Sequence, residues 1–375
     1  MRRLGRVIGA LLGVAVVGLG GVYFFLGGGR RLEDRTSAPE LAGAALVVAA
    51  ELDYPPGNIA VSKAGRVFFT YHPDGDPPAQ VMELVDGKPV PYPREAIEPA
   101  YQTVLSVRID RQDRLWVLDH AGYGRGQPRI LAFDLASDRL VHRYDFPSDV
   151  AGLASMLNDF QVDPAGETIY IAEASPIIRR PAIIVYDVVR GTSRRLLERH
   201  PSVMPDDFIL HVGGRDMYAF GLVPLRIGVD SIALDRRGEW LYYGPVNGDR
   251  LYRVATRDLR DLQLAPAALA RKVEDFAPKT LSDGLSSDDA GRVYLTDPEH
   301  SAIVVVEPDG KRLRTLVKDP RLRWPDGLSF GPDGWLWLTC SALEDFLFRP
   351  VSARAAHAPY QIWRFQPGAT ATPGQ

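Results

Sequence analysis

The sequence predicts an all-β chain built from six similar units, and three observations support this prediction. A pair of strand-like runs recurs six times, and a polar or Gly-containing turn joins the two runs of each pair. Successive turns lie 43–53 residues apart, with one interval of 72 residues, and four-stranded propeller blades repeat about every 40–50 residues. Gly (35) and Pro (30) are plentiful and scattered, which suits a turn-rich fold. We therefore predict a six-bladed β-propeller, preceded by one N-terminal hydrophobic segment.

Each unit begins with a small or polar residue, continues with alternating apolar positions and ends in an aromatic-rich run. Alternation indicates a strand with one packed face, whereas runs such as LWVL and WLWL indicate strands buried on both faces. The six units span residues 57–70, 105–119, 158–173, 230–244, 283–297 and 326–339. Further strands of blades two to six are expected at residues 129–133, 182–187, 250–254, 302–307 and 361–365.

Two further segments complete the predicted ring. Residues 44–52 are apolar, and we expect them to add a strand to the last blade and so to cover a sheet edge. The interval of 72 residues predicts an extra loop within residues 200–227. A doubly wound α/β sheet would need amphipathic helices between its strands, and only residues 267–276 have a helical pattern. A sandwich or barrel would not require six similar units at this spacing.

The first residues of the chain contain a membrane-targeting pattern. Three arginines precede residues 7–29, which carry no charge, and roughly 20 apolar residues span a bilayer. A cleaved signal peptide is the alternative, but no small-x-small site follows directly, which favours an uncleaved anchor. The large following domain predicts a propeller in the periplasm or extracellular space, membrane-anchored, or secreted if the segment is cleaved. The expected organisation is a signal anchor or signal peptide over 1–29, a linker over 30–43 and the propeller over 44–375.

Charge and cysteine content argue against several classes of function. Lys+Arg total 44 against 47 Asp+Glu, and no basic stripe is present, which argues against a nucleic-acid partner. The single cysteine, Cys340, excludes an intrachain disulfide and a Cys-based zinc cluster, and we expect it to be buried in a strand. The sequence contains neither HExxH nor G-x-S-x-G. We expect a monomer that meets the membrane only through its N-terminal segment.

The repeat places one residue of every unit in the same register, two positions before the first apolar residue. In a propeller, equivalent positions form a ring around the channel, and four of these six residues are Asn or Asp. Converging oxygens repel one another unless a cation neutralises them, either calcium or the ammonium group of a ligand near aromatic rings. The structural alternative is that these side chains cap turns and strand starts. The six residues are Gly57, Leu105, Asn158, Asp230, Asp283 and Asp326.

Other candidates depend on their position in the repeat. Asp326 shares the ring register, although PDG is also a turn signal, and Asn58 is a candidate to supply an oxygen beside Gly57. His120 and Glu173 lie at the ends of the second strands of blades two and three, where they could reach a ligand or serve as satisfied loop residues. The turn aspartates are predicted to be structural. These are Asp110, Asp163, Asp235 and Asp288.

The ordered set of motifs resembles the major royal jelly protein/yellow family over about residues 50–366. The resemblance implies a six-bladed propeller with a central ligand channel, usually in a secreted protein; insect members are tied to pigmentation and to the binding of small amines. This chain lacks the paired cysteines of those insect proteins. The motifs are GNIAVSKAGRVFFTYHP, QVMELVDGKPVPYP, NDFQVDPAGETIYIAEAS, AIIVYD, GVDSIALDRRGEWLYYGPVNGDRLYRV, WPDGLSFGPDGWLWLTCSALE and QIWRF.

A more distant resemblance is to the gluconolactonase/senescence-marker family of propellers, whose members hold a divalent cation, often calcium. The resemblance implies that Asn158, Asp230 and Asp283 are metal ligands and that Asp283 is also the catalytic base. The family's fourth ligand, a Glu in blade one, falls at Gly57, which departs from the pattern.

Three functions therefore remain open. The first is binding of a small molecule in the central channel, and the second is a metal-dependent lactonase or esterase-type hydrolase. In the second, a cation would polarise the carbonyl and acidify water, and a nearby carboxylate would act as base. The third is a cell-envelope scaffold that binds another protein through the propeller faces, since a fold does not fix a function.

Overall fold

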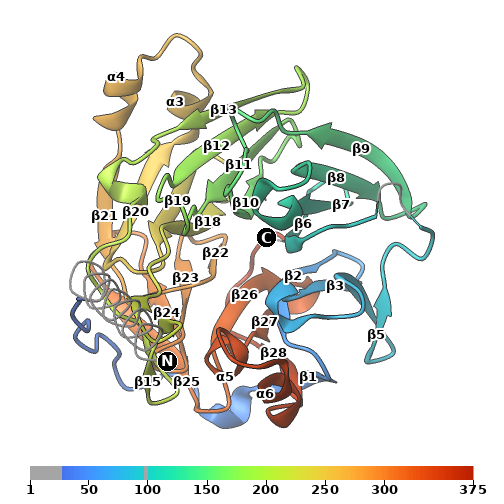
Figure 1. Cartoon of the computed structure of the whole chain (residues 1–375), viewed down its shortest axis with the longest axis vertical. Helices are drawn as coiled ribbons and strands as arrows, with labels where there is room; N and C mark the ends of the chain where they lie inside the picture. Colours follow the sequence, from blue (N-terminus) through green and yellow to red (C-terminus); the bar gives the residue numbers. More distant parts are fainter. Residues whose placement is uncertain (1–27, 97–99, 375) are drawn as a thin grey trace, which may run out of the picture.

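A computed structural model describes residues 28–96 and 100–374. Six four-stranded antiparallel sheets surround a central axis, which confirms the predicted six-bladed propeller (Figure 1). The first strands of neighbouring blades contact one another around this axis, so they form the channel wall. The predicted hydrophobic segment, residues 1–29, lies almost entirely outside the described residues. Within the described ranges, no helix is long and apolar enough to cross a membrane.

Blades one to three follow the first three sequence units. In each blade the chain runs from the inner strand outward through three hairpins, because every connection joins neighbouring antiparallel strands. Blade one contains β2 Pro56–Val61, β3 Val67–Tyr71, β4 Val81–Val85 and β5 Lys88–Pro91. Blade two contains β6 Val104–Ile109, β7 Arg114–Asp119, β8 Arg129–Asp134 and β9 Arg139–Asp145. Blade three contains β10 Leu157–Val162, β11 Thr168–Glu173, β12 Ala182–Asp187 and β13 Thr192–Leu196.

Blades four to six repeat this order, and the last blade closes the ring. The predicted closing segment forms β1 Val47–Leu52, which pairs antiparallel with β28 Tyr360–Phe365 as the outer strand of blade six. The edge of β28 is thereby covered. Blade four contains β18 Val229–Leu234, β19 Trp240–Pro245, β20 Arg250–Ala255 and β21 Glu274–Pro278. Blade five contains β22 Leu285–Ser287, β23 Val293–Asp297, β24 Ala302–Val306 and β25 Leu313–Lys318, and blade six also contains β26 Pro325–Phe330 and β27 Leu336–Cys340.

Short elements fill the connections. The extra loop predicted within residues 200–227 contains two small hairpins, and we call residues 204–227 the insertion. Its strands are β14 His211–Val212, β15 Arg215–Asp216, β16 Tyr218–Ala219 and β17 Val223–Pro224. Among the described residues the α-helices are α2 Ala121–Gly124, α3 Thr256–Arg260, α4 Pro266–Ala270, α5 Leu343–Phe346 and α6 Val351–Ala356. The 3-10 turns are η1 Gly43–Ala45, η2 Pro73–Gly75, η3 Pro201–Val203 and η4 Pro332–Gly334.

The helix expected over residues 267–276 is shorter than predicted. Helix α4 ends at Ala270, and the residues from Glu274 onward instead form β21. The physical reason is that blade four needs an outer strand, and pairing with β20 outweighs the local helical pattern.

Apolar side chains fill the space between neighbouring blades. One buried cluster joins blades two and three around Trp116, Phe160 and Ile171, and comparable clusters occupy the other five interfaces. Cys340 is 3% exposed in β27, which confirms the predicted buried position. Adjacent blades therefore share their cores, so the ring is held together by packing between blades.

The segment expected to be a linker, residues 30–43, packs along the outside of the propeller. Arg35 donates to the Asp249 carboxylate at 2.7 Å, and the Leu41 amide donates to the Leu316 carbonyl at 2.8 Å. These contacts fix the path of the chain from the loops of blade four to the edge of blade five.

Candidate functional site

A recurrent irregularity aims the ring residues at the channel. In blades one, two, three, four and six, the register between the first and second strands shifts at the beginning of the inner strand. Such β-bulges leave residues unpaired and turn their side chains, often beside functional sites. The residues inside these shifts include Gly57, Leu105, Asn158, Asp230 and Asp326, which are five of the six predicted ring positions.

Threonines of the second strands support the inner strands at this point. In blade one, the Thr70 hydroxyl accepts a hydrogen bond from the Asn58 amide at 2.9 Å. The equivalent Thr296 and Thr339 accept from the amides of Gly284 and Gly327 at 2.7 and 2.9 Å. Because a buried amide without a partner is costly, these hydroxyls stabilise backbone that the sheet leaves unpaired.

All six predicted ring residues line one small cavity on the axis, about 60 Å³ in volume. A drug-sized ligand normally occupies about 300–1,000 Å³, so this cavity suits an ion, a few waters or one end of a ligand. Among its described lining residues there is no lysine or arginine. The lining comprises Gly57, Asn58, His72, Leu105, Met156, Asn158, Asp159, Ile227, Asp230, Asp283, Asp326 and Leu343.

Three carboxyl groups converge from blades four, five and six. Burial, and then the neighbouring Asp283 carboxyl, raise the pKa of Asp230 well above its usual range. The same two causes, burial first, raise the pKa of Asp326 well above its usual range. The Asn158 amide donates to Asp230, and Trp324 Nε1 donates to Asp283 at 2.5 Å. A hydrogen bond from Ser341 lowers the pKa of Asp326, but burial and Asp283 outweigh it, so acidic groups predominate in the cavity.

The fourth acidic residue of the cavity, Asp159, has a different environment, and sequence reasoning missed it. Its carboxylate accepts from Asn58 Nδ2 at 2.8 Å, from Ser106 Oγ at 3.0 Å and from Arg108 at 3.5 Å. Arg108, whose side chain is 2% exposed, also donates to Asn58 Oδ1 at 2.5 Å. Both polar atoms of the Asn58 amide are thus already bonded. The signal in the sequence was a charged residue between the apolar positions of SVRID, where the other units have an uncharged residue.

The structure also explains the glycine at the position of the missing Glu ligand. A Cβ atom at Gly57 would lie 2.8 Å from Thr70 Oγ1. That hydroxyl is held in place, since it donates to the Leu105 carbonyl at 2.8 Å and accepts from the Asn58 amide. Any side chain at position 57 would therefore displace this support, and blade one contributes no carboxylate to the cavity.

Two predicted ligand-binding residues lie outside the cavity lining. His120 is buried, its Nδ1 accepts from the Tyr123 amide at 2.9 Å, and burial lowers its pKa to about 4. Glu173 accepts from Arg195 at 2.7 Å and from the Met156 amide at 3.0 Å. Both side chains therefore have local partners that match the structural alternative.

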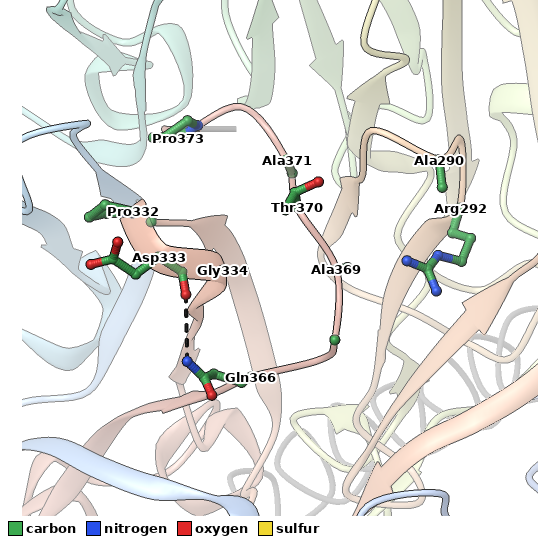
Figure 2. A pocket seen from close by; sticks show the side chains of 12 residues that line it. Ala290, Arg292, Pro332, Asp333, Gly334, Gln366, Ala369, Thr370, Ala371 and Pro373 are labelled. Carbon is green, nitrogen blue, oxygen red and sulfur yellow. Dashed lines mark hydrogen bonds between the residues drawn. The ribbon is translucent and has the colours of Figure 1, made fainter.

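A larger cavity of about 630 Å³ lies at the opposite end of the strands. Figure 2 shows the side chains that line it. Turn residues of blades five and six and the C-terminal residues 366–373 line it; Gln366 Nε2 donates to the Asp333 carbonyl at 3.5 Å. Its arginine, Arg292, is already paired with Asp288 at 2.6 Å. We favour the small axial cavity as the functional site, because three carboxyl groups converge there and two of them have raised pKa values.

The donor chemistry of the axial cavity suits a hard cation, but the side chains are not arranged as a metal centre. Carboxylate and amide oxygens are typical calcium ligands. Across residues 28–96 and 100–374, however, no group of three or more His, Cys, Asp or Glu residues could hold a metal ion as placed. Of the three predicted ligands, Asn158 directs its amide nitrogen, not its oxygen, at Asp230.

A comparison with known protein families shows to which family this chain belongs. The model of the major royal jelly protein family matches residues 102–363. The chain belongs to the major royal jelly protein family. Major royal jelly proteins 1 and 7 of Apis mellifera are 29% and 28% identical over 166 residues, which are 40% and 41% of this chain. The chain spans only about a third, 36% and 35%, of the length of these relatives.

Solved structures share the fold of this family member at low sequence identity. A gluconolactonase from Xanthomonas campestris has a TM-score of 0.54 and 15% identity, covering 86% of this chain and 88% of its own. The calcium-binding protein regucalcin from Agrobacterium tumefaciens has a TM-score of 0.54 and 14% identity, covering 90% and 97%. A luciferin-regenerating enzyme has a TM-score of 0.56 and 12% identity, covering 88% and 97%. These likenesses show a common propeller.

Proposed function

We propose that this major royal jelly family propeller binds a small molecule whose positively charged group enters the axial cavity. The observation that carries the proposal is the convergence of Asp230, Asp283 and Asp326 in a cavity whose lining, as far as the structure describes the chain, contains no lysine or arginine. Like charges brought together in a buried site raise one another's pKa, and a bound cation relieves this repulsion. The cavity volume of about 60 Å³ suits an ammonium group, with the rest of the ligand outside.

The nearby Arg108 favours the charged form of Asp326, but its hydrogen bonds go to other groups. Arg108 donates to Asn58 and to two backbone carbonyls, and its carboxylate partner is Asp159. His72 also lines the cavity, but burial lowers its pKa, so it is neutral at physiological pH. A positively charged group of a ligand would therefore balance the negative charge of Asp230 and Asp326.

A divalent-cation-dependent lactonase or esterase is the second candidate function. The one observation that favours it is the set of carboxyl and amide oxygens in the cavity, which are typical ligands of a divalent cation. Asn158, Asp230 and Asp283 would hold the ion, which would supply positive charge to polarise a carbonyl. Asn158 would first have to turn its amide oxygen toward the ion, because its nitrogen now faces Asp230. Asp283, whose carboxyl already contacts Trp324 and Asp230, is the residue placed to accept a proton.

The two candidates separate in one thermal unfolding experiment on the full chain. The melting temperature is measured with calcium, magnesium, and a series of alkyl- and arylalkylammonium salts, for the parent, Asp283→Asn and Asp235→Asn. A ligand at 100 times its dissociation constant stabilises the native state by about 2.7 kcal/mol. Asp283→Asn should lose the response, whereas Asp235→Asn, at the other end of the propeller, should melt lower and keep it.

The ammonium salts and the metal ions test different candidate functions. A shift with ammonium salts supports binding of a cationic small molecule. A shift with calcium alone supports the metal site, and lactones and esters are then screened for hydrolysis. If neither kind of cation shifts the melting temperature of the parent, the proposal is wrong.

A further inference from the structure

Exposed apolar side chains gather at one end of the propeller. The inner strands begin at the axial cavity, so loops that precede a first strand or follow a second strand lie at the cavity end. Five of the large apolar side chains that are exposed in the described residues belong to such loops, and Phe220 is 83% exposed and Leu153 74%. The five are Leu153, Ile177, Ile178, Phe220 and Phe348.

Two of these side chains form an exposed aromatic pair. Phe220 lies in the turn of the β16–β17 hairpin, and Phe348 follows α5; their ring centroids are 5.6 Å apart. The segments that carry them also reach the cavity, because Ile227 of the insertion and Leu343 of α5 are lining residues. Exposed aromatic side chains that pack on one another in this way are typical of an interaction site in soluble domains.

The N-terminal apolar sequence joins the propeller at this same end. The Gly28 carbonyl accepts from Arg226, the residue before Ile227, and Arg30 forms a parallel bridge with Phe208 of the insertion. The residues that precede this point, 7–29, are uncharged and long enough in sequence to span a bilayer. Arg30 and Arg349 are exposed in the same region, where they could contact anionic headgroups.

We propose that the cavity end of the propeller rests on a lipid bilayer, with Phe220, Phe348 and Leu153 in the interfacial region, in contrast to the expectation that only the N-terminal segment meets the membrane. A membrane anchor that leaves the propeller at Gly28 holds this end near the membrane, and the exposed apolar loops then lose contact with water. The axial cavity consequently faces the headgroups, so its ligand reaches it from the membrane surface. This inference does not depend on which cation the cavity binds.

The orientation is tested with the full chain in vesicles of phosphatidylcholine and phosphatidylglycerol. Phe220→Cys and Leu153→Cys are labelled with an environment-sensitive fluorophore, and Val189→Cys and Leu262→Cys are the matched controls. Val189 and Leu262 are also exposed, 73% and 59%, but lie in loops between third and fourth strands, at the opposite end. The parent measures background labelling of Cys340, which is buried.

Labels at positions 220 and 153 should be quenched by lipids that carry a nitroxide and protected severalfold from aqueous iodide, whereas labels at 189 and 262 should show the reverse. Combining Phe220→Ser with Phe348→Ser should reduce the lipid quenching at position 153, and combining Val189→Ser with Leu262→Ser should not. Equal iodide access at 220 and 262 would overturn the proposal. Protection at 220 without lipid quenching would also overturn it, because a second copy of the chain would then cover this face.

Discussion

The two ends of the inner strands use aspartate in opposite ways. Asp283 and Asp288 flank strand β22. Asp283 precedes the strand and lines the cavity, whereas Asp288 follows it in the turn. Asp288 accepts from two backbone amides, from Arg292 Nε at 2.6 Å and from the Tyr294 hydroxyl at 2.9 Å. Asp283 has Trp324 Nε1 as a donor and otherwise faces the carboxyl of Asp230.

The same contrast separates Asp110 of blade two from Asp326 of blade six. Asp110 at the turn end accepts from Arg114 and from Trp116 Nε1, whereas Asp326 at the cavity end has its pKa raised well above its usual range by burial and by Asp283. An aspartate in this repeat thus has local hydrogen-bond partners where donors surround it and a raised pKa where other acids surround it. The effect of replacing each aspartate should therefore depend on the number of hydrogen-bond donors near its carboxyl group.

The largest expected effect is at the turn end. Asp288→Ala removes a fully buried acceptor and leaves Arg292 without its partner, so unfolding should become easier by about 4 kcal/mol. Urea denaturation measures this change, and Asp289→Ala is the control in the same turn. A loss below about 1 kcal/mol would mean that the turn donors do not stabilise the propeller.

Arg108→Met tests the one acidic residue of the cavity that does have a charged partner. The substitution leaves Asp159 buried without its ion pair, which should cost about 3 kcal/mol at pH 8. Adding Asp159→Asn should recover part of this loss, because it removes the uncompensated charge. If the double variant is as unstable as the sum of the two single variants, the pair is not coupled.

Asp326→Asn should raise the stability of the protein, in contrast to the two substitutions above. The folded-state pKa of Asp326 is raised, so its contribution to stability is complete below the ordinary carboxyl pKa and is lost as pH rises through the folded value. The parent should therefore lose stability from this group between pH 5 and pH 8, and the variant should be about 1 kcal/mol more stable at pH 8. Urea denaturation at both pH values measures the difference; a less stable variant at pH 8 would contradict the account.

A surface change at the cavity end should have the smallest effect. Phe220→Ser removes an exposed ring and should alter the free energy of unfolding by less than about 0.5 kcal/mol. A larger loss in urea denaturation would mean that the Phe220–Phe348 pair supports the insertion.

Much of the fold followed from the sequence because propeller blades repeat local patterns. Strand alternation predicted the hairpins, and the apolar residues 44–52 predicted the closing strand of blade six. The shared register brought all six ring residues to one cavity. The function of that cavity stays a prediction.

The contacts between blades could not be predicted, since they depend on bulges that alternation does not encode. Asp159 follows Asn158 directly, but only the bulge of β10 brings its carboxylate to Arg108 of the neighbouring blade. Within blade three, Glu173 pairs with Arg195 of the outer strand, and the insertion packs against blades six and one; alternation does not encode these contacts either.

The most direct test measures how many protons the protein releases when it binds a cation. Calorimetric titration of the full chain with the cation that raises its melting temperature, in buffers of different ionisation enthalpy at pH 6.5, gives the number of protons released on binding. Because the carboxyls of Asp230 and Asp326 have raised pKa values, the account predicts proton release by the parent and less release by Asp326→Asn, with affinity rising as pH rises. Binding without proton release, or equal release from the variant, would contradict it.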